Sequence, residues 1–134
     1  MQQAVFGSVI YAYTRAQAIG DGYLVDVSKV AQEAGFIFPV AVTRRVWDEI
    51  ITPPAAVKEL GQSEDGRLWD VLWMLKVAIS KDKSQGGQIQ YQLIVQNDFE
   101  HDLEDPRYLV TLKSLCHGGD DREPVVTIMM PDED

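Results

Sequence analysis

The stretch RLWDVLWMLKVAIS, residues 67–80, decides the expected fold. Read as a helix, it leaves only a thin polar strip made by Asp70, Lys76 and Ser80. A helix that is apolar nearly all round is normally covered on most of its sides. The stretch therefore predicts a central helix against which the other elements pack.

Three segments in the C-terminal half have the pattern of strands. Residues 88–95, QIQYQLIV, place apolar side chains on one face and mostly glutamine on the other, which indicates a strand with one buried face. Residues 108–115 and 125–130 also read as strands, with the turn GGDD at 118–121 between them. This order of strands favours a three-stranded antiparallel meander.

The N-terminal half predicts short helices separated by extended pieces. The capped segments are 14–20, 29–34 and 44–51, with Thr14, Ser28 and Thr43 as the capping residues. Gln17 forms a capping box with Thr14, and Gly35 is expected to end the second segment in a left-handed conformation. Residues 23–27 read as a short extended piece, and residues 36–42 as an edge strand or a connector, because Pro39 has no N–H to donate. We therefore expect one α+β domain over residues 1–134, with a helix-rich N-terminal half packed on a C-terminal three-stranded antiparallel β-meander.

The negative charge is concentrated at the C-terminal end. The chain has 134 residues and a formal net charge of −9, and residues 98–134 hold eleven carboxylates against three basic side chains, a net −8. Such a field repels phosphate backbones and attracts basic surfaces. We expect a basic protein surface as the partner and no direct nucleic-acid binding, with Asp120, Asp121, Glu123, Asp102 and Glu104 as the contact residues. The alternative is that these carboxylates only keep the protein in solution.

A second set of candidates would line a pocket between the helix at 67–80 and the sheet. Asp26 and Asp70 are embedded in apolar stretches, which favours shifted pKa values, although both also suit positions near a helix start. Trp69 and Trp73 share a helix face that more often belongs to the core, and they become contact candidates if they are exposed. The predicted pocket residues are Asp26, Arg67, Trp69, Asp70 and Trp73.

No motif in the chain specifies a reaction. Neither a phosphate-binding glycine loop nor a dinucleotide fingerprint occurs. The acidic run that starts at Asp98 lacks the glycine and the glutamate that an EF-hand loop requires, and His101, Cys116 and His117 lack the spacing of a metal site. We therefore predict no catalytic residue, no cofactor and no metal ligand.

The expected compartment follows from three further features. No apolar run reaches the roughly 18 residues that span a bilayer, and the N-terminus MQQAVFGSVIYAY lacks the basic region and cleavage site of a secretory signal. A single cysteine, Cys116, excludes an intramolecular disulfide. These features predict a cytoplasmic protein without membrane association.

Several strings together resemble a family of small uncharacterised bacterial proteins that travel on plasmids, phages and integrated elements. The strings are YTRAQAI (13–19), LVDVS (24–28), PVAVT (39–43), DGRLWDVLWM (65–74), LVTLK (109–113) and EPVVTIMMP (123–131). The resemblance covers nearly the whole length, and GRLWDVLW is its most specific part. It implies a bacterial source and a mobile-element setting, and it assigns no activity to any residue.

Two functions of different classes follow. The first is a non-enzymatic interaction module or inhibitor of a mobile element, whose acidic face imitates nucleic acid or covers a basic surface. The alternative is a small enzyme or ligand-binding domain with its pocket beside the helix at 67–80. The oligomeric state stays open at this point.

Overall fold

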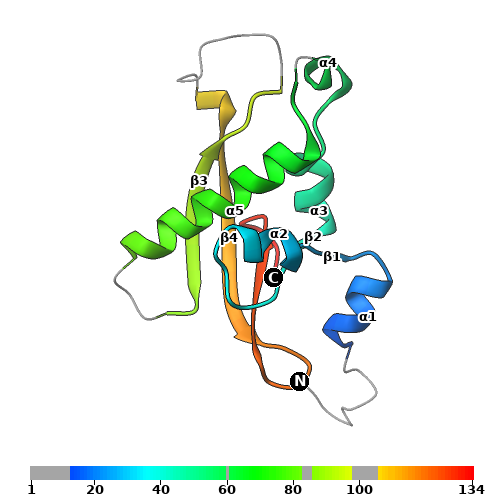
Figure 1. Cartoon of the computed structure of the whole chain (residues 1–134), viewed down its shortest axis with the longest axis vertical. Coiled ribbons are helices and arrows are strands. Elements are labelled where there is room, and N and C mark those ends of the chain that lie inside the picture. The colour runs from blue at the N-terminus through cyan, green and yellow to red at the C-terminus, as the bar shows by residue number, and fades with distance from the viewer. Residues whose placement is uncertain (1–12, 60, 83–85, 98–105) are drawn as a thin grey trace.

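The computed structural model describes residues 13–59, 61–82, 86–97 and 106–134. Its centre is a five-stranded sheet in the order β1-β2-β5-β4-β3 (Figure 1). The β2–β5 pair is parallel and the other three pairs are antiparallel. The strands are β1 (Leu24–Asp26), β2 (Val40–Thr43), β3 (Gln88–Ile94), β4 (Leu109–Gly118) and β5 (Pro124–Met129).

The predicted architecture, a helix-rich half on a three-stranded meander, is wrong. The N-terminal half contributes two strands, so that the sheet is mixed and five-stranded. Strand β2 lies between β1 and β5 and is therefore not an edge strand. Pro39 does not prevent this position, because the strand begins at Val40 and the residue without an N–H lies outside the ladder. The Pro39 carbonyl instead accepts the Val126 N–H at 2.9 Å.

The helices of the first half are short, and their capping residues explain where they begin. Helix α1 begins after Thr14, and the predicted capping box with Gln17 is confirmed. Thr43 caps α3, as expected, but Ser28 is the first residue of α2, where its hydroxyl accepts the Val40 N–H at 3.0 Å. The helices are α1 (Arg15–Gly20), α2 (Ser28–Glu33), α3 (Arg44–Val46) continued by a π-helical turn (Trp47–Ile51), α4 (Ala55–Lys58) and α5 (Glu64–Lys81), with a 3-10 turn at Pro106–Tyr108. Among the helices of the described residues, none is long and apolar enough to cross a membrane.

Helix α5 covers one face of the sheet and extends beyond it. It lies obliquely across the strands, and its C-terminal end passes the edge strand β3 (Figure 1). One side of α5 packs with the sheet in the main core, through Leu68, Val71, Leu72 and Leu75 against Val40, Val42, Leu93, Leu112 and Ile128. The expectation of a helix covered on most sides is wrong, because Trp69, Trp73, Met74 and Ile79 stay exposed.

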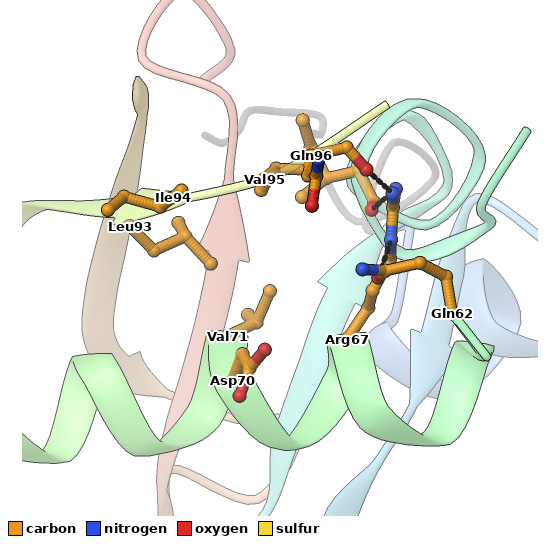
Figure 2. Close-up of a pocket in the computed structure, with 9 residues that line it drawn as sticks. Gln62, Arg67, Asp70, Val71, Leu93, Ile94, Val95 and Gln96 are labelled. Atoms are coloured by element: carbon orange, nitrogen blue, oxygen red, sulfur yellow. Dashed lines mark hydrogen bonds between the residues drawn. The ribbon is translucent and has the colours of Figure 1, made fainter. Parts of the chain in front are cut away.

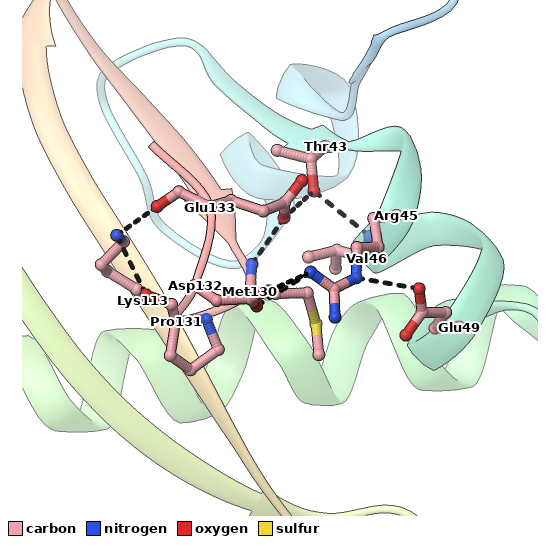
Figure 3. A network of polar contacts seen from close by, with 9 residues as sticks. All are labelled: Thr43, Arg45, Val46, Glu49, Lys113, Met130, Pro131, Asp132 and Glu133. Atoms are coloured by element: carbon pink, nitrogen blue, oxygen red, sulfur yellow. Dashed lines mark hydrogen bonds and ion pairs between the residues drawn. The ribbon is translucent and has the colours of Figure 1, made fainter.

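The last residues of the chain are held against the sheet and α3 (Figure 3). Arg45 donates from Nη1 to both carboxylate oxygens of Asp132, at 2.8 and 2.7 Å. The Glu133 carboxylate accepts the Thr43 hydroxyl at 2.8 Å and the Met130 N–H at 2.7 Å. The buried Lys113 ammonium donates to main-chain carbonyls of the same segment. Two carboxylates of the acidic C-terminal region, those of Asp132 and Glu133, therefore make intramolecular contacts.

Candidate functional site

Trp69 and Trp73 form an exposed, ordered pair on the outer side of α5. Their rings are stacked, with centroids 6.0 Å apart and planes 10° from parallel. Trp69 is 38% exposed and Trp73 is 45% exposed. Lys76 lies over the Trp73 ring, 5.5 Å from its centroid, and its Nζ also donates to the Ala34 carbonyl at 2.8 Å. The pair is therefore held in place by helix spacing on one side and by a tethered cation on the other.

Apolar side chains of the α2–β2 connector continue this surface. On the connector, Ile37 is 85% exposed and Phe38 is also exposed, and Ile79 on α5 is exposed as well. They line a groove of about 430 Å³ together with Lys76, which joins the groove to the tryptophan pair. We refer to Trp69, Trp73, Ile37, Phe38 and Ile79 as the tryptophan surface.

Gly35 allows the connector to pass close to Lys76. Its φ is +100°, a left-handed conformation that favours glycine, and it follows the end of α2 as the sequence predicts. A Cβ at this position would lie 2.0 Å from Lys76 Nζ. A larger residue at 35 would therefore displace the ammonium from Trp73.

A cavity of about 230 Å³ opens on the other side of α5, between the helix and β3 (Figure 2). Arg67 is only 5% exposed, and each of its three side-chain nitrogens donates to a neutral acceptor. Nη1 donates to the Ile50 carbonyl at 3.1 Å, Nη2 to the Gln96 carbonyl at 2.5 Å, and Nε to Gln62 Oε1 at 3.3 Å. The cavity is lined by Ile50, Gln62, Arg67, Asp70, Val71, Leu93, Ile94, Val95 and Gln96.

Arg67 and Asp70 influence each other without forming an ion pair. Burial raises the pKa of Asp70, and the Arg67 charge opposes that rise. Burial also lowers the pKa of Arg67, with Asp70 opposing the change. Within the described residues, no carboxylate lies within ion-pair distance of Arg67. The guanidinium therefore holds the π-helical turn and the end of β3 together through their carbonyls.

The predicted pocket residues do not all meet at this cavity. Arg67 and Asp70 line it, whereas Trp69 and Trp73 are on the tryptophan surface. Asp26 ends β1, the edge strand at the far side of the sheet from β3, where it accepts the Ser28 N–H at 3.0 Å and the Ser28 hydroxyl at 2.6 Å. Asp26 therefore stabilises the start of α2, as the alternative interpretation expected.

The predicted partner-binding carboxylates have different environments. Asp120 accepts the main-chain N–H groups of Arg15 and Ala16, at 2.7 and 3.0 Å. Asp121 and Glu123 are exposed in the turn before β5, and the Glu123 carboxylate accepts the Asp121 N–H at 3.3 Å. The other two, Asp102 and Glu104, lie outside the described residues.

A polar chain on the second face of the sheet was not predicted. Arg15 Nη1 donates to Thr127 Oγ1 at 2.7 Å, and His117 Nε2 lies 2.8 Å from the same oxygen. Arg15 Nη2 also donates to the Val126 carbonyl at 2.9 Å. The three side chains fix α1 to β5, which no local pattern signals because they are far apart in the chain.

The groove residues Ile37 and Phe38 were also missed as a site. The sequence predicts an edge strand or a connector over residues 36–42, and the structure places both residues in the connector before β2. The only available signal was the run of large apolar residues directly after the helix-ending Gly35. In the part of the chain that the structure describes, no three His, Cys, Asp or Glu side chains group as a metal site requires.

Comparison with known proteins identifies a family without an assigned activity. A model described as a family of unknown function (DUF6573) matches residues 3–134. No curated protein and no solved structure matches the chain. The arrangement of the side chains is therefore the main guide to function.

Proposed function

The chain belongs to the DUF6573 family of unknown function, and we propose that it is a non-enzymatic protein-interaction module that binds a basic protein surface through the tryptophan surface. One observation carries the proposal: two indoles are stacked in a fixed geometry and yet remain 38% and 45% exposed. Covering them would contribute on the order of 2 kcal/mol for each indole. Because the rings are already ordered, little side-chain entropy would be lost on binding.

The charges of α5 favour a basic occupant. Asp65 lies one helical turn before Trp69. An arginine of a partner that stacks on Trp69 would have this carboxylate within reach, and stacked guanidinium groups gain cation–π attraction. The net charge of −9 would steer such a partner toward the molecule.

The exposed carboxylates of the C-terminal turn have a secondary role in this proposal. Asp121 and Glu123, with Asp102 and Glu104 in the acidic stretch, add to the attractive field, whereas Asp120 caps α1. An acidic protein that covers a basic surface would compete with nucleic acid for it, which fits an inhibitor carried on a mobile element.

Isothermal titration calorimetry with a ten-residue arginine peptide tests this proposal. We expect binding that weakens with salt, and a loss of about tenfold or more in affinity for the Trp69→Ala/Trp73→Ala double variant. The Asp121→Asn/Glu123→Gln variant is the matched control. Its affinity for the peptide should fall only by the salt-dependent, electrostatic contribution. Unchanged affinity in the tryptophan variant, with its circular dichroism intact, would overturn the proposal.

The cavity beside α5 favours a second candidate function, the binding of a small carboxylate. The specific observation is that the buried Arg67 donates only to neutral acceptors at the cavity, while the Asp70 carboxylate acts on it without forming an ion pair. A bound carboxylate would give the guanidinium a direct, charge-assisted hydrogen bond. Titration with propionate, followed by the NMR signals of the Ile50 and Val71 methyl groups, should shift those signals if the site exists. Signals that do not move would exclude this candidate.

A further inference from the structure

Strand β3 is an edge strand whose outer main-chain groups can be identified. The Cys116 N–H donates to the Gly87 carbonyl at 2.7 Å, and the Val95 N–H donates to the Tyr108 carbonyl at 2.8 Å. Since hydrogen-bonding direction alternates along a strand, the odd-numbered residues of β3 direct their N–H and C=O groups toward β4. The even-numbered residues Gln88, Gln90, Gln92 and Ile94 therefore direct theirs outward, and no strand of the described residues pairs with that side.

This edge lacks the features that normally prevent strand pairing. Edge strands are usually protected by lysine, proline or a bulge. Residues 88–94 contain no charged residue and no proline, and the ladder with β4 runs without interruption from Gln88 to Ile94. The strand is neutral although the chain carries a net charge of −9.

Helix α5 provides a cover over the position where a sixth strand would lie. Its C-terminal part extends past β3 in Figure 1. Met74, Val77 and Lys81 on the helix and Gln90 on the strand line a groove of about 480 Å³ along this edge. Met74 is 36% exposed, so an apolar part of this cover is open to solvent.

We propose that a second copy of this chain occupies this edge, so that the two β3 strands pair antiparallel about a two-fold axis at Gln90. Gln90 then lies opposite Gln90 of the second copy, and Gln88 opposite Gln92 of the second copy. The glutamine amides of the two copies can hydrogen-bond to each other, because each amide has both donors and an acceptor. A row of like charges at these positions would instead repel the same row of the second copy. Ile94 faces Gly86 of the second copy, which leaves room for its side chain.

The same axis explains the overhang of α5. A two-fold axis perpendicular to the sheet places both α5 helices on one face of a continuous ten-stranded sheet. The C-terminal part of each helix then covers β3 of the other copy, and Met74 and Val77 become buried. The tryptophan surface lies on a different side of α5, so this inference and the proposed function can fail separately.

Sedimentation equilibrium from micromolar to millimolar concentration tests the dimer. The wild-type chain should be dimeric, and Gln90→Pro should weaken dimerisation about tenfold or more, because it removes an outward N–H without breaking a bond to β4. Gln90→Lys places two ammonium groups opposite each other and should have the same effect without altering the backbone, whereas Gln90→Ala is the control that retains the dimer.

Two results would overturn the inference. One is a wild-type chain that stays monomeric over the whole range, which would leave the edge to a different polypeptide. The other is a Gln90→Lys variant that is as dimeric as the wild type, because the pairing would then lie elsewhere. Circular dichroism shows whether Gln90→Pro is monomeric because it is unfolded. If it is unfolded, the Gln90→Lys variant is used to test the dimer.

Discussion

The Asp120 carboxylate accepts the main-chain N–H of Arg15 at 2.7 Å, across 105 positions of the chain. The same carboxylate accepts the Ala16 N–H, so two donors at the start of α1 are satisfied from the turn between β4 and β5. The guanidinium of Arg15 then reaches Thr127 on β5. A residue chosen as a partner contact therefore fastens α1 to the sheet.

Replacing Asp120 with alanine should lower stability and leave partner binding nearly unchanged. Loss of a capping side chain costs about 0.5–2 kcal/mol in the free energy of unfolding. Urea denaturation measures the loss, and Asp121→Ala in the same exposed turn is the control, expected to change it by less than about 0.5 kcal/mol. Equal effects of the two substitutions would contradict the capping role.

Replacing Arg67 with methionine should be strongly destabilising. The substitution leaves the Ile50 and Gln96 carbonyls without their donor, at a cost of about 2–4 kcal/mol in the free energy of unfolding. Urea denaturation should show the change as a lower midpoint. Arg44→Met is the matched control, because the contacts of Arg44 with Asp48 and with the Gly22 carbonyl are both exposed and should contribute less than about 1 kcal/mol. A loss for Arg67→Met as small as that of the control would contradict the structural role of Arg67.

Asp70→Asn should stabilise the protein at neutral pH. Burial raises the pKa of Asp70 in the folded state, so ionisation opposes folding, and stability falls as pH rises through that pKa. The gain should stay below about 1 kcal/mol because water screens the exposed part of the carboxylate. It should vanish in acid, where Asp70 is protonated in both states. Thermal unfolding across pH measures this difference.

Asp65→Asn provides the control of opposite sign. Asp65 lies in the first turn of α5, where a negative charge interacts favourably with the helix dipole, so its loss should lower stability slightly at neutral pH. If both substitutions change the melting temperature in the same direction, the burial of Asp70 is not the cause.

Arg45→Gln should raise the pKa of Asp132. The hydrogen bonds from Arg45 hold this pKa below its ordinary value, and without them it should return toward that value. The Arg45–Asp132 contact therefore stabilises the fold above the unfolded-state pKa, and this contribution is lost as pH falls through the folded pKa. Carbon NMR of the carboxyl group gives the value directly. A pKa that does not move would exclude Arg45 as its cause.

Local elements were predictable where the signal lies within one segment. The period-two pattern indicated β3, and the capping pair of Thr14 and Gln17 indicated α1. The most apolar stretch was correctly assigned to the long helix α5. These features depend on hydrogen bonds and side-chain spacings between residues that are close in the sequence. They can therefore be predicted from the sequence directly.

The candidate sites were only partly predictable, because some of their residues come from segments that are far apart in the sequence. Arg67 and Asp70 are three positions apart on one helix, and they do share a cavity. The tryptophans share the same helix and lie outside the cavity, since the side of α5 that the sheet leaves uncovered depends on the crossing direction of the helix. Asp26 belongs to another edge of the sheet altogether.

Most individual helices and strands, the charge imbalance and the lack of catalytic motifs could be predicted from the order of residues, although α4 was not. The parallel pairing of β2 with β5, the exposure of Trp69 and Trp73 and the open edge at β3 became visible only in the folded chain. Strand pairing and burial bring together segments that are far apart in the sequence, so no local pattern specifies them.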